Sequence, residues 1–90
     1  MANDLSPYLD RIQILVASGN PLDGLKAVQS QMRDGRLIVV ICHTSSSPMV
    51  LLGHMHTYMN GFGSFIGISY TSGNKDRYYC SNGTWTTEQY

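Results

Sequence analysis

The chain has 90 residues, of which 42% are hydrophobic and 13% are charged, and its six basic and six acidic side chains give a formal net charge of zero. This composition is typical of a globular protein and excludes a disordered chain, while the length predicts one domain with a modest core. Because the basic side chains are few and scattered, we expect neither nucleic acid nor an anionic membrane surface as a partner.

The N-terminal third of the chain carries two helix patterns. Ser6-Pro7 is typical of a helix start, and apolar residues then recur at helical spacing until Gly19. Asn20-Pro21 begins a second helix, which Gly35 closes. We expect the two helices to form an αα-hairpin whose apolar stripes face the core: Leu9, Ile12, Leu15 and Val16 in the first helix, and Leu22, Leu25, Val28 and Met32 in the second.

The remainder of the chain is predicted to be antiparallel sheet. Residues 37–74 include no Asp, Glu, Lys or Arg, and their longest apolar runs fall far short of the about 18 residues that indicate a membrane span. In residues 37–42 the odd- and the even-numbered positions are all apolar, which indicates a strand buried on both faces. The dipeptides Asn60-Gly61 and Asn82-Gly83 are typical of two-residue type I′ hairpins.

Together these patterns predict an α+β fold. We expect a single domain over residues 1–90, in which an N-terminal αα-hairpin (1–35) packs on a four- to five-stranded antiparallel meander sheet (36–90).

The N-terminus and the two cysteines bear on the cellular compartment. Met-Ala-Asn-Asp lacks the basic and apolar regions of a signal peptide. We therefore expect a cytoplasmic protein, with a secreted or cell-surface protein as the alternative if a leader has been removed. Cys42 and Cys80 fit both compartments, because they could be two buried thiols or one disulfide.

His54 and His56 form the most specific motif in the chain. Residues two apart on a strand leave the same face, so both imidazoles lie close together. With a third ligand, such as His43 or a symmetry-related copy of the pair, they could bind zinc or a similar metal. The chain has no third ligand at a recognisable spacing, so the sequence favours two histidines on a half-exposed face and no cofactor.

The sequence contains no strong pattern of residues that is typical of a catalytic site. Cys42 and His43 are adjacent, but neighbours on a strand point to opposite faces, so the imidazole cannot act as base for the thiol. The sequence therefore favours a non-enzymatic protein, and a metal-dependent enzyme built on His54 and His56 is the alternative.

Aromatic and imidazole side chains are concentrated in the predicted strands. Such residues are enriched in binding surfaces because they combine a large area with a polar tip. Uncharged strands also do little to repel a second strand, so self-association is expected. We therefore predict a small inhibitor- or adaptor-like protein that engages a protein partner, a copy of itself, or both through this uncharged sheet face. The candidate binding residues are His54, His56, Tyr58, Tyr70, Tyr79 and Trp85.

One short segment suggests a different binding function. Cys80-Ser-Asn-Gly-Thr-Trp85 is similar to the Cys-x-x-Gly-x-Trp endings of some bacterial surface and pilus-tip proteins. The resemblance covers six residues and does not identify a family. It implies an extracytoplasmic, adhesin-like module that recognises a glycan or a cell surface, which requires a removed leader and a disulfide between Cys42 and Cys80.

Overall fold

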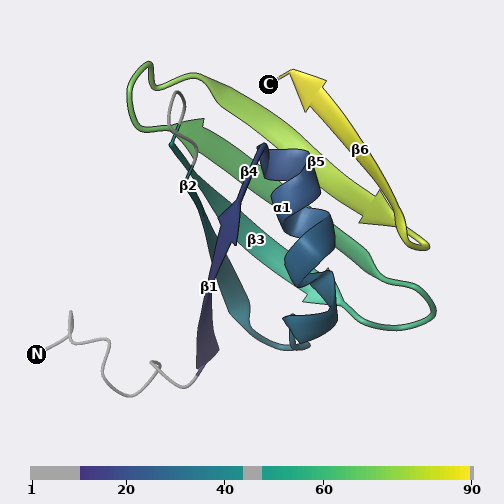
Figure 1. The fold of residues 1–90 in the computed structure, drawn as a ribbon. Coiled ribbons are helices and arrows are strands. Elements are labelled where there is room, and N and C mark those ends of the chain that lie inside the picture. Colours follow the sequence, from purple (N-terminus) through teal and green to yellow (C-terminus); the bar gives the residue numbers. More distant parts are fainter. Residues whose placement is uncertain (1–10, 44–47, 90) are drawn as a thin grey trace, which may run out of the picture.

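The fold is a six-stranded sheet with one helical layer on one of its two faces (Figure 1). We describe it from a computed structural model, which defines residues 11–43 and 48–89. The elements in chain order are β1 (Ile12–Ser18), α1 (Pro21–Val28), the 3-10 helix η2 (Gln29–Gln31), β2 (Leu37–His43), β3 (Met49–His56), β4 (Phe62–Ser69), β5 (Lys75–Ser81) and β6 (Thr84–Gln89). The strands lie side by side in the order in which they occur in the chain.

The predicted N-terminal αα-hairpin is wrong, because residues 12–18 form strand β1. Ile12, Leu15 and Val16 match helical spacing, but the same segment also alternates, with Ile12, Ile14 and Val16 on one face. Three β-branched side chains in five residues lose rotamer freedom in a helix and fit a pleated strand well. The predicted helix start at Ser6-Pro7 lies outside the described residues.

The second predicted helix is present but shorter than expected. Asn20 is its N-cap, and its side-chain oxygen accepts a hydrogen bond of 2.9 Å from the backbone N–H of Asp23. The α-helix ends at Val28 and continues as η2 to Gln31, well before Gly35. The expected apolar stripe is confirmed, since Leu25, Val28 and Met32 are all buried.

The sheet is mixed and has six strands, so the predicted antiparallel meander of four to five strands is also wrong. β1 pairs with β2 in parallel, and every later neighbour is antiparallel. Parallel neighbours need a crossover connection, which α1 and η2 supply between β1 and β2. Because residues 12–18 also match helical spacing, the sequence predicts a helical hairpin in place of this β–α–β unit.

The two Asn-Gly dipeptides behave differently. Asn82 and Gly83 both have positive φ, 50° and 84°, as a two-residue type I′ turn requires, so the predicted β5–β6 hairpin is confirmed. The predicted two-residue turn at Asn60-Gly61 is wrong, because β3 ends at His56 and β4 begins at Phe62, and the positive φ angles lie at Met59 and Gly61. The two turns touch each other, because the Gly83 N–H donates to the Gly61 carbonyl at 3.0 Å.

The hydrophobic core lies between the helical layer and the face of the sheet that it covers (Figure 1). Phe65 in β4 and Leu25 in α1 are its largest completely buried side chains. The close approach of helix and sheet depends on Gly24, where an added Cβ would lie 3.1 Å from both Ala17 Cβ and Cys42 Sγ. None of the described helices is long and apolar enough to cross a membrane.

Gln29 ties the end of the helical layer to two distant parts of the sheet. Its side-chain oxygen accepts a hydrogen bond of 2.9 Å from the indole N–H of Trp85, which is buried in β6. Its side-chain nitrogen donates at 2.8 Å to the carbonyl of Asn60 in the β3–β4 turn. One amide therefore satisfies a donor and an acceptor from segments that are remote in sequence.

We expect Gln29→Ala to lower the free energy of unfolding by about 1–3 kcal/mol, because it leaves the Trp85 indole N–H without its partner beneath the helix. Gln31→Ala, which removes an exposed amide from the same 3-10 helix, is the matched control and should change stability by less than about 0.5 kcal/mol. Urea denaturation measures both values, and equal effects would contradict the role assigned to Gln29.

Candidate functional site

The face of the sheet opposite α1 carries a continuous apolar surface. Side chains alternate between the two faces of each strand, and both α1 and η2 lie on the same face as the core. We call the opposite side the open face. Its aliphatic side chains from the first four strands form what we call the apolar ladder: Ile12, Ile14, Val16, Leu37, Val39, Ile41, Val50, Leu52, Ile66 and Ile68.

The strand register places these side chains in rows across the sheet. Two complete rows each hold four aliphatic side chains: Val16, Ile41, Val50 and Ile68 in the first, and Ile14, Val39, Leu52 and Ile66 in the second. Directly opposed β-branched and aliphatic pairs stabilise neighbouring strands. The same rows also leave a continuous hydrophobic strip across four strands.

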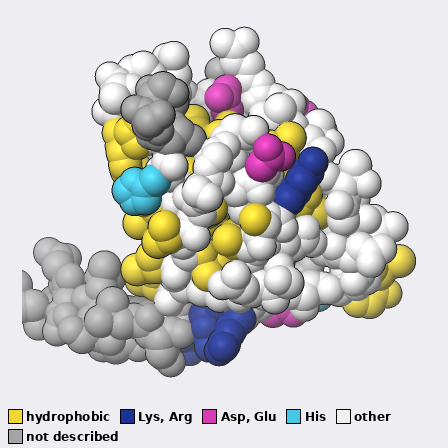
Figure 2. Space-filling model, in the orientation of Figure 1, with side chains coloured by type: hydrophobic (Ala, Val, Ile, Leu, Met, Phe, Trp, Pro, Cys, Tyr) yellow, Lys and Arg dark blue, Asp and Glu magenta, His cyan; other side chains and the backbone are white. Residues whose placement is uncertain are grey.

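Part of this strip is far more exposed than is usual for aliphatic side chains. Ile14 and Val16 are 64% and 65% exposed, and Leu37 and Leu52 are 49% and 38% exposed. Hydrophobic side chains also gather along the side of the molecule where β1 and β2 lie (Figure 2). Contiguous apolar patches of this kind mark interaction sites on soluble proteins, whereas scattered single residues do not.

Within the described strands, the charged side chains of the open face come from β5 and β6, while Asp34 lies beside His56 where β3 ends. Lys75 and Arg77 project from β5, and Glu88 projects from β6. Arg77 Nη1 lies 3.7 Å from Glu88 Oε2, and its guanidinium carbon lies 4.7 Å from the centre of the Tyr79 ring. The open face is therefore divided into an apolar part, β1 to β4, and a charged part, β5 and β6.

The predicted binding residues do not all share this face. His54 and His56 lie on it in β3, and Tyr79 lies on it in β5. Tyr58 and Tyr70 are exposed in the segments that follow β3 and β4. Trp85 lies on the opposite face, where it is 8% exposed and packs against Phe65 with 6.0 Å between ring centres.

The apolar ladder was missed as a site by sequence reasoning. The predicted binding residues are aromatic or imidazole groups, and the helical spacing of Ile12 and Val16 placed both on the inward face of a helix. The signal that could have found it is the alternation of Ile12, Ile14 and Val16 together with Val39, Ile41, Val50 and Leu52, once residues 12–18 are read as a strand.

The two strand histidines are not joined by a third metal ligand. Residues 11–43 and 48–89 include no group of three or more His, Cys, Asp or Glu side chains arranged to hold a metal ion. His43 lies at the far end of β2, six residues and thus roughly 20 Å from the position opposite His54. His54 itself pairs with Ser64 across the β3–β4 ladder.

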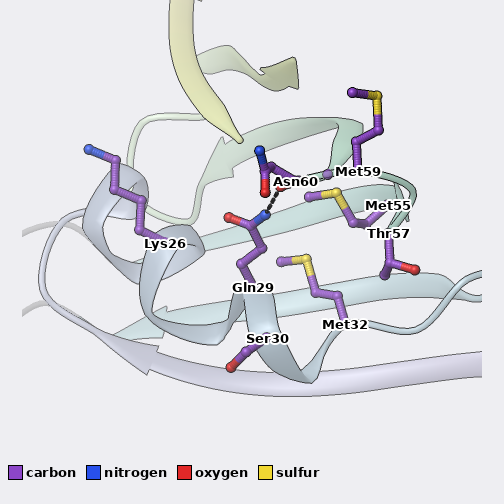
Figure 3. A pocket seen from close by; sticks show the side chains of 9 residues that line it. Lys26, Gln29, Ser30, Met32, Met55, Thr57, Met59 and Asn60 are labelled. Carbon is purple, nitrogen blue, oxygen red and sulfur yellow. Dashed lines mark hydrogen bonds between the residues drawn. The ribbon is translucent and has the colours of Figure 1, made fainter. Parts of the chain in front are cut away.

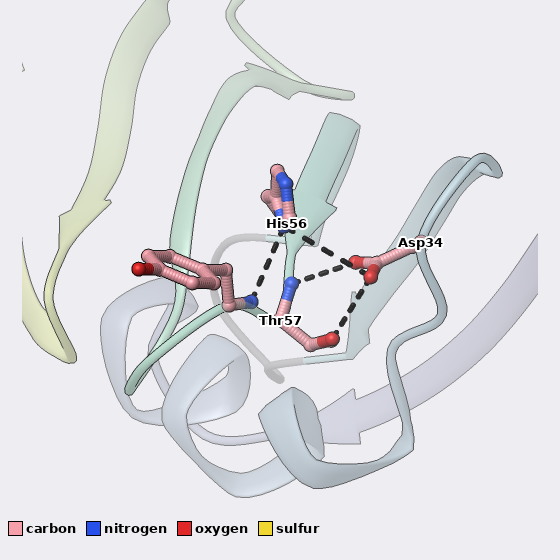
Figure 4. A network of polar contacts seen from close by, with 4 residues as sticks. Asp34, His56 and Thr57 are labelled. Carbon is pink, nitrogen blue, oxygen red and sulfur yellow. Dashed lines mark hydrogen bonds and ion pairs between the residues drawn. The ribbon is translucent and has the colours of Figure 1, made fainter.

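Asp34, His56 and Thr57 form a polar cluster at the end of β3 (Figure 4). The Asp34 carboxylate accepts hydrogen bonds from the Thr57 backbone N–H at 2.6 Å and the Thr57 hydroxyl at 2.9 Å. Both hydrogen bonds stabilise the charged form and so hold the pKa of Asp34 below its ordinary value. The bond from the backbone N–H has the larger effect, and the bond from the hydroxyl has the smaller one. A carboxylate with a lowered pKa is a weak proton acceptor, so this cluster suits a structural role better than acid–base catalysis.

His56 has two partners that need different protonation states. The backbone N–H of Tyr58 donates to His56 Nδ1 at 3.2 Å, which requires that this nitrogen carry no proton. Asp34 Oδ2 lies 3.9 Å from the same nitrogen and pairs with it only when the imidazole is charged. A hollow of about 560 Å³ lies beside this cluster, lined by residues 34–36 and 54–56.

A second hollow, of about 390 Å³, lies between the helical layer and the β3–β4 turn (Figure 3). Met32, Met55 and Met59 line it, with Gln29 and Asn60 joined by their hydrogen bond at its side. The side chains of Met32 and Met55 both extend toward the space beside Gln29 (Figure 3). Flexible thioether side chains can adapt to an apolar group.

Cys42 and Cys80 are free and buried, and the fold keeps them apart. Cys42 is in β2 and Cys80 is in β5, so two strands intervene and their Cα atoms are separated by at least about 14 Å. A disulfide needs Cα atoms within about 7 Å. The bond between Cys42 and Cys80 that the sequence left open therefore cannot form within this fold.

No protein-family model, curated protein or solved structure matches the chain.

Burial raises the pKa of both the Cys42 and the Cys80 thiol, because desolvation disfavours the thiolate. We expect neither thiol to react with an aromatic disulfide reagent in the native protein at neutral pH, and both to react within the mixing time in strong denaturant. Rapid stoichiometric labelling of either thiol in the native protein would contradict the burial described here.

The lowered pKa of Asp34 should depend on both the backbone N–H and the side-chain hydroxyl of Thr57. Thr57→Ala removes the hydroxyl and should raise the carboxyl pKa part of the way to its ordinary value, whereas Thr57→Ser keeps a donor and should leave it low. Since the pKa is lowered on folding, the stability that Asp34 contributes is present above about pH 4 and is lost as pH falls through the folded-state pKa. Carbon NMR of the Asp34 carboxyl measures the titration, and identical curves for both variants would refute the assignment.

Proposed function

We propose that this chain is a small non-enzymatic binding protein, inhibitor- or adaptor-like, that engages a protein partner or a copy of itself through the open face of its sheet. The observation that carries the proposal is the apolar ladder, which crosses four strands and faces away from the helical layer. A domain of this size gains stability from each aliphatic side chain that it buries, so leaving such a strip exposed is costly unless another surface covers it.

The energy available from covering the ladder supports this proposal. The exposed fractions of Ile14, Val16, Leu37 and Leu52 together amount to about two complete aliphatic side chains. Burying one such side chain contributes about 1.5–3 kcal/mol, so covering these four contributes about 3–6 kcal/mol before the cost of association. The half-buried members of the ladder add to this figure.

The groups around the ladder suit the rim of a protein interface. His54 and Tyr79 lie on the same face beside the aliphatic rows, and both combine a ring with a polar tip. The charged side chains Arg77 and Glu88 lie further out. An apolar centre with a polar margin is the common arrangement in protein–protein interfaces, and it does not suit a phosphate backbone, which needs a basic surface.

We also propose that this binding takes place in the cytoplasm. The two free, buried thiols support a reducing compartment. The extracytoplasmic alternative required a disulfide between Cys42 and Cys80, and their separation across the sheet removes that support.

A photo-crosslinking amino acid at position 52, in the centre of the ladder, tests the proposal in the cells that produce the protein. We expect a discrete covalent adduct from position 52 and none from position 27, which is exposed on the outer side of α1. The two sites are matched, because each replaces a single aliphatic residue. The same adducts from both positions, or none from position 52, would show that the open face is not the binding surface.

A further inference from the structure

We infer that the surface that covers the open face is the open face of a second copy of this chain, so that two sheets pack face to face as a sandwich. This inference rests on the proposed function and names its partner.

The apolar ladder is compatible with itself. Its two complete rows hold only Val, Leu and Ile, so packing these rows on their copies buries no charge and leaves no polar group without a partner. An isologous contact needs one surface that complements its own copy, and an uncharged aliphatic strip is chemically compatible with its own copy. Two sheets stacked at about 10 Å with strands within about 30° of each other form the core of a β-sandwich.

The position of the charges selects one of two possible symmetries. A two-fold axis across the strands would place β5 over β5, so that Lys75 and Arg77 of one copy would oppose the same residues of the other. An axis along the strands, between β2 and β3, places β1 over β4 and β2 over β3. The two complete rows then cover each other, Leu37 and Ile12 face His54 and Ser64 of the other copy, and the charged strands β5 and β6 extend beyond the overlap. Like charges in contact disfavour the first arrangement, so we infer the second.

The ladder is small for a protein interface. Four strands at about 4.8 Å and five residues at about 3.3 Å give a projected footprint of roughly 320 Å² on each copy. Two such footprints total roughly 640 Å², about half the lower end of the range for stable interfaces, although the side chains make the accessible area larger. We therefore infer a weak, reversible dimer, and not a permanent assembly.

The main competing arrangement uses a strand edge. β1 is the outermost strand next to β2, and none of its seven residues is charged. Two copies could pair β1 with β1 and extend the sheet. That contact would leave Leu52 and Ile66, in the inner strands β3 and β4, uncovered. Substitutions in these inner strands therefore distinguish face-to-face packing from edge pairing.

The test is sedimentation equilibrium of the full chain over a wide micromolar range, comparing the unmodified protein with Leu52→Lys and Thr86→Lys. Both substitutions place a lysine on the open face, the first inside the ladder and the second on β6, outside the overlap. We expect a concentration-dependent dimer, a dissociation constant raised at least about tenfold by Leu52→Lys, and a change of less than about threefold for Thr86→Lys. Ile66→Thr, which keeps a β-branched side chain, replaces Leu52→Lys if circular dichroism shows that the lysine variant is unfolded.

Each other outcome overturns the inference. A dimer that survives both Leu52→Lys and Ile66→Thr uses a different surface, such as the β1 edge. Equal weakening by Thr86→Lys places β6 inside the contact and excludes the proposed axis. A monomer at all concentrations removes the second copy as partner, and the crosslink at position 52 then decides the proposed function separately. An adduct of twice the 10.0 kDa chain supports the second copy only where sedimentation also shows the dimer, an adduct of another mass keeps only the proposed function, and no adduct overturns both.

Discussion

The parallel pairing of β1 with β2 is the contact on which the rest of this structure depends. Parallel neighbours must be joined by a crossover, and the only helical segment between them is α1 with η2. That crossover lies on one side of the sheet, where Leu25 and Val28 complete the core. A helix of eight residues followed by one short turn covers one face of six strands and cannot also cover the second. The exposure of Ile14 and Val16 follows directly from this arrangement.

The core face and the open face use different chemistry. On the core face, glycines let backbones approach, and buried polar groups such as the Trp85 indole are paired. On the open face, β-branched residues from adjacent strands meet in rows, which favours the sheet itself. The rows that stabilise strand pairing also form the surface offered to a partner. Stability of the sheet and binding by the sheet therefore depend on the same side chains.

The titratable side chains near the apolar part of the open face lie at the margins of the apolar ladder. His56 and Asp34 lie where β3 ends, and His43 lies at the opposite end of β2. Burying an ionised group in an interface costs far more than burying an aliphatic one. Their location around the ladder, and not within it, leaves the centre of the open face able to lose water at little cost.

Local features that depend on neighbouring residues could be predicted from the sequence, because capping, helix periodicity, turn geometry and strand alternation act over a few residues. They are the Asn20 cap, the apolar stripe from Leu25 to Met32, the strands on either side of Asn82-Gly83 and the shared face of His54 and His56. The strand at residues 12–18 could not be predicted in this way, because it depends on a contact that is remote in the chain. Their pattern satisfies helical and strand spacing equally, and pairing with residues 37–43, remote in the chain, selects the strand. That one long-range contact also decided which apolar side chains enter the core and which remain on the open face, since a face is defined only when the neighbouring strand is known.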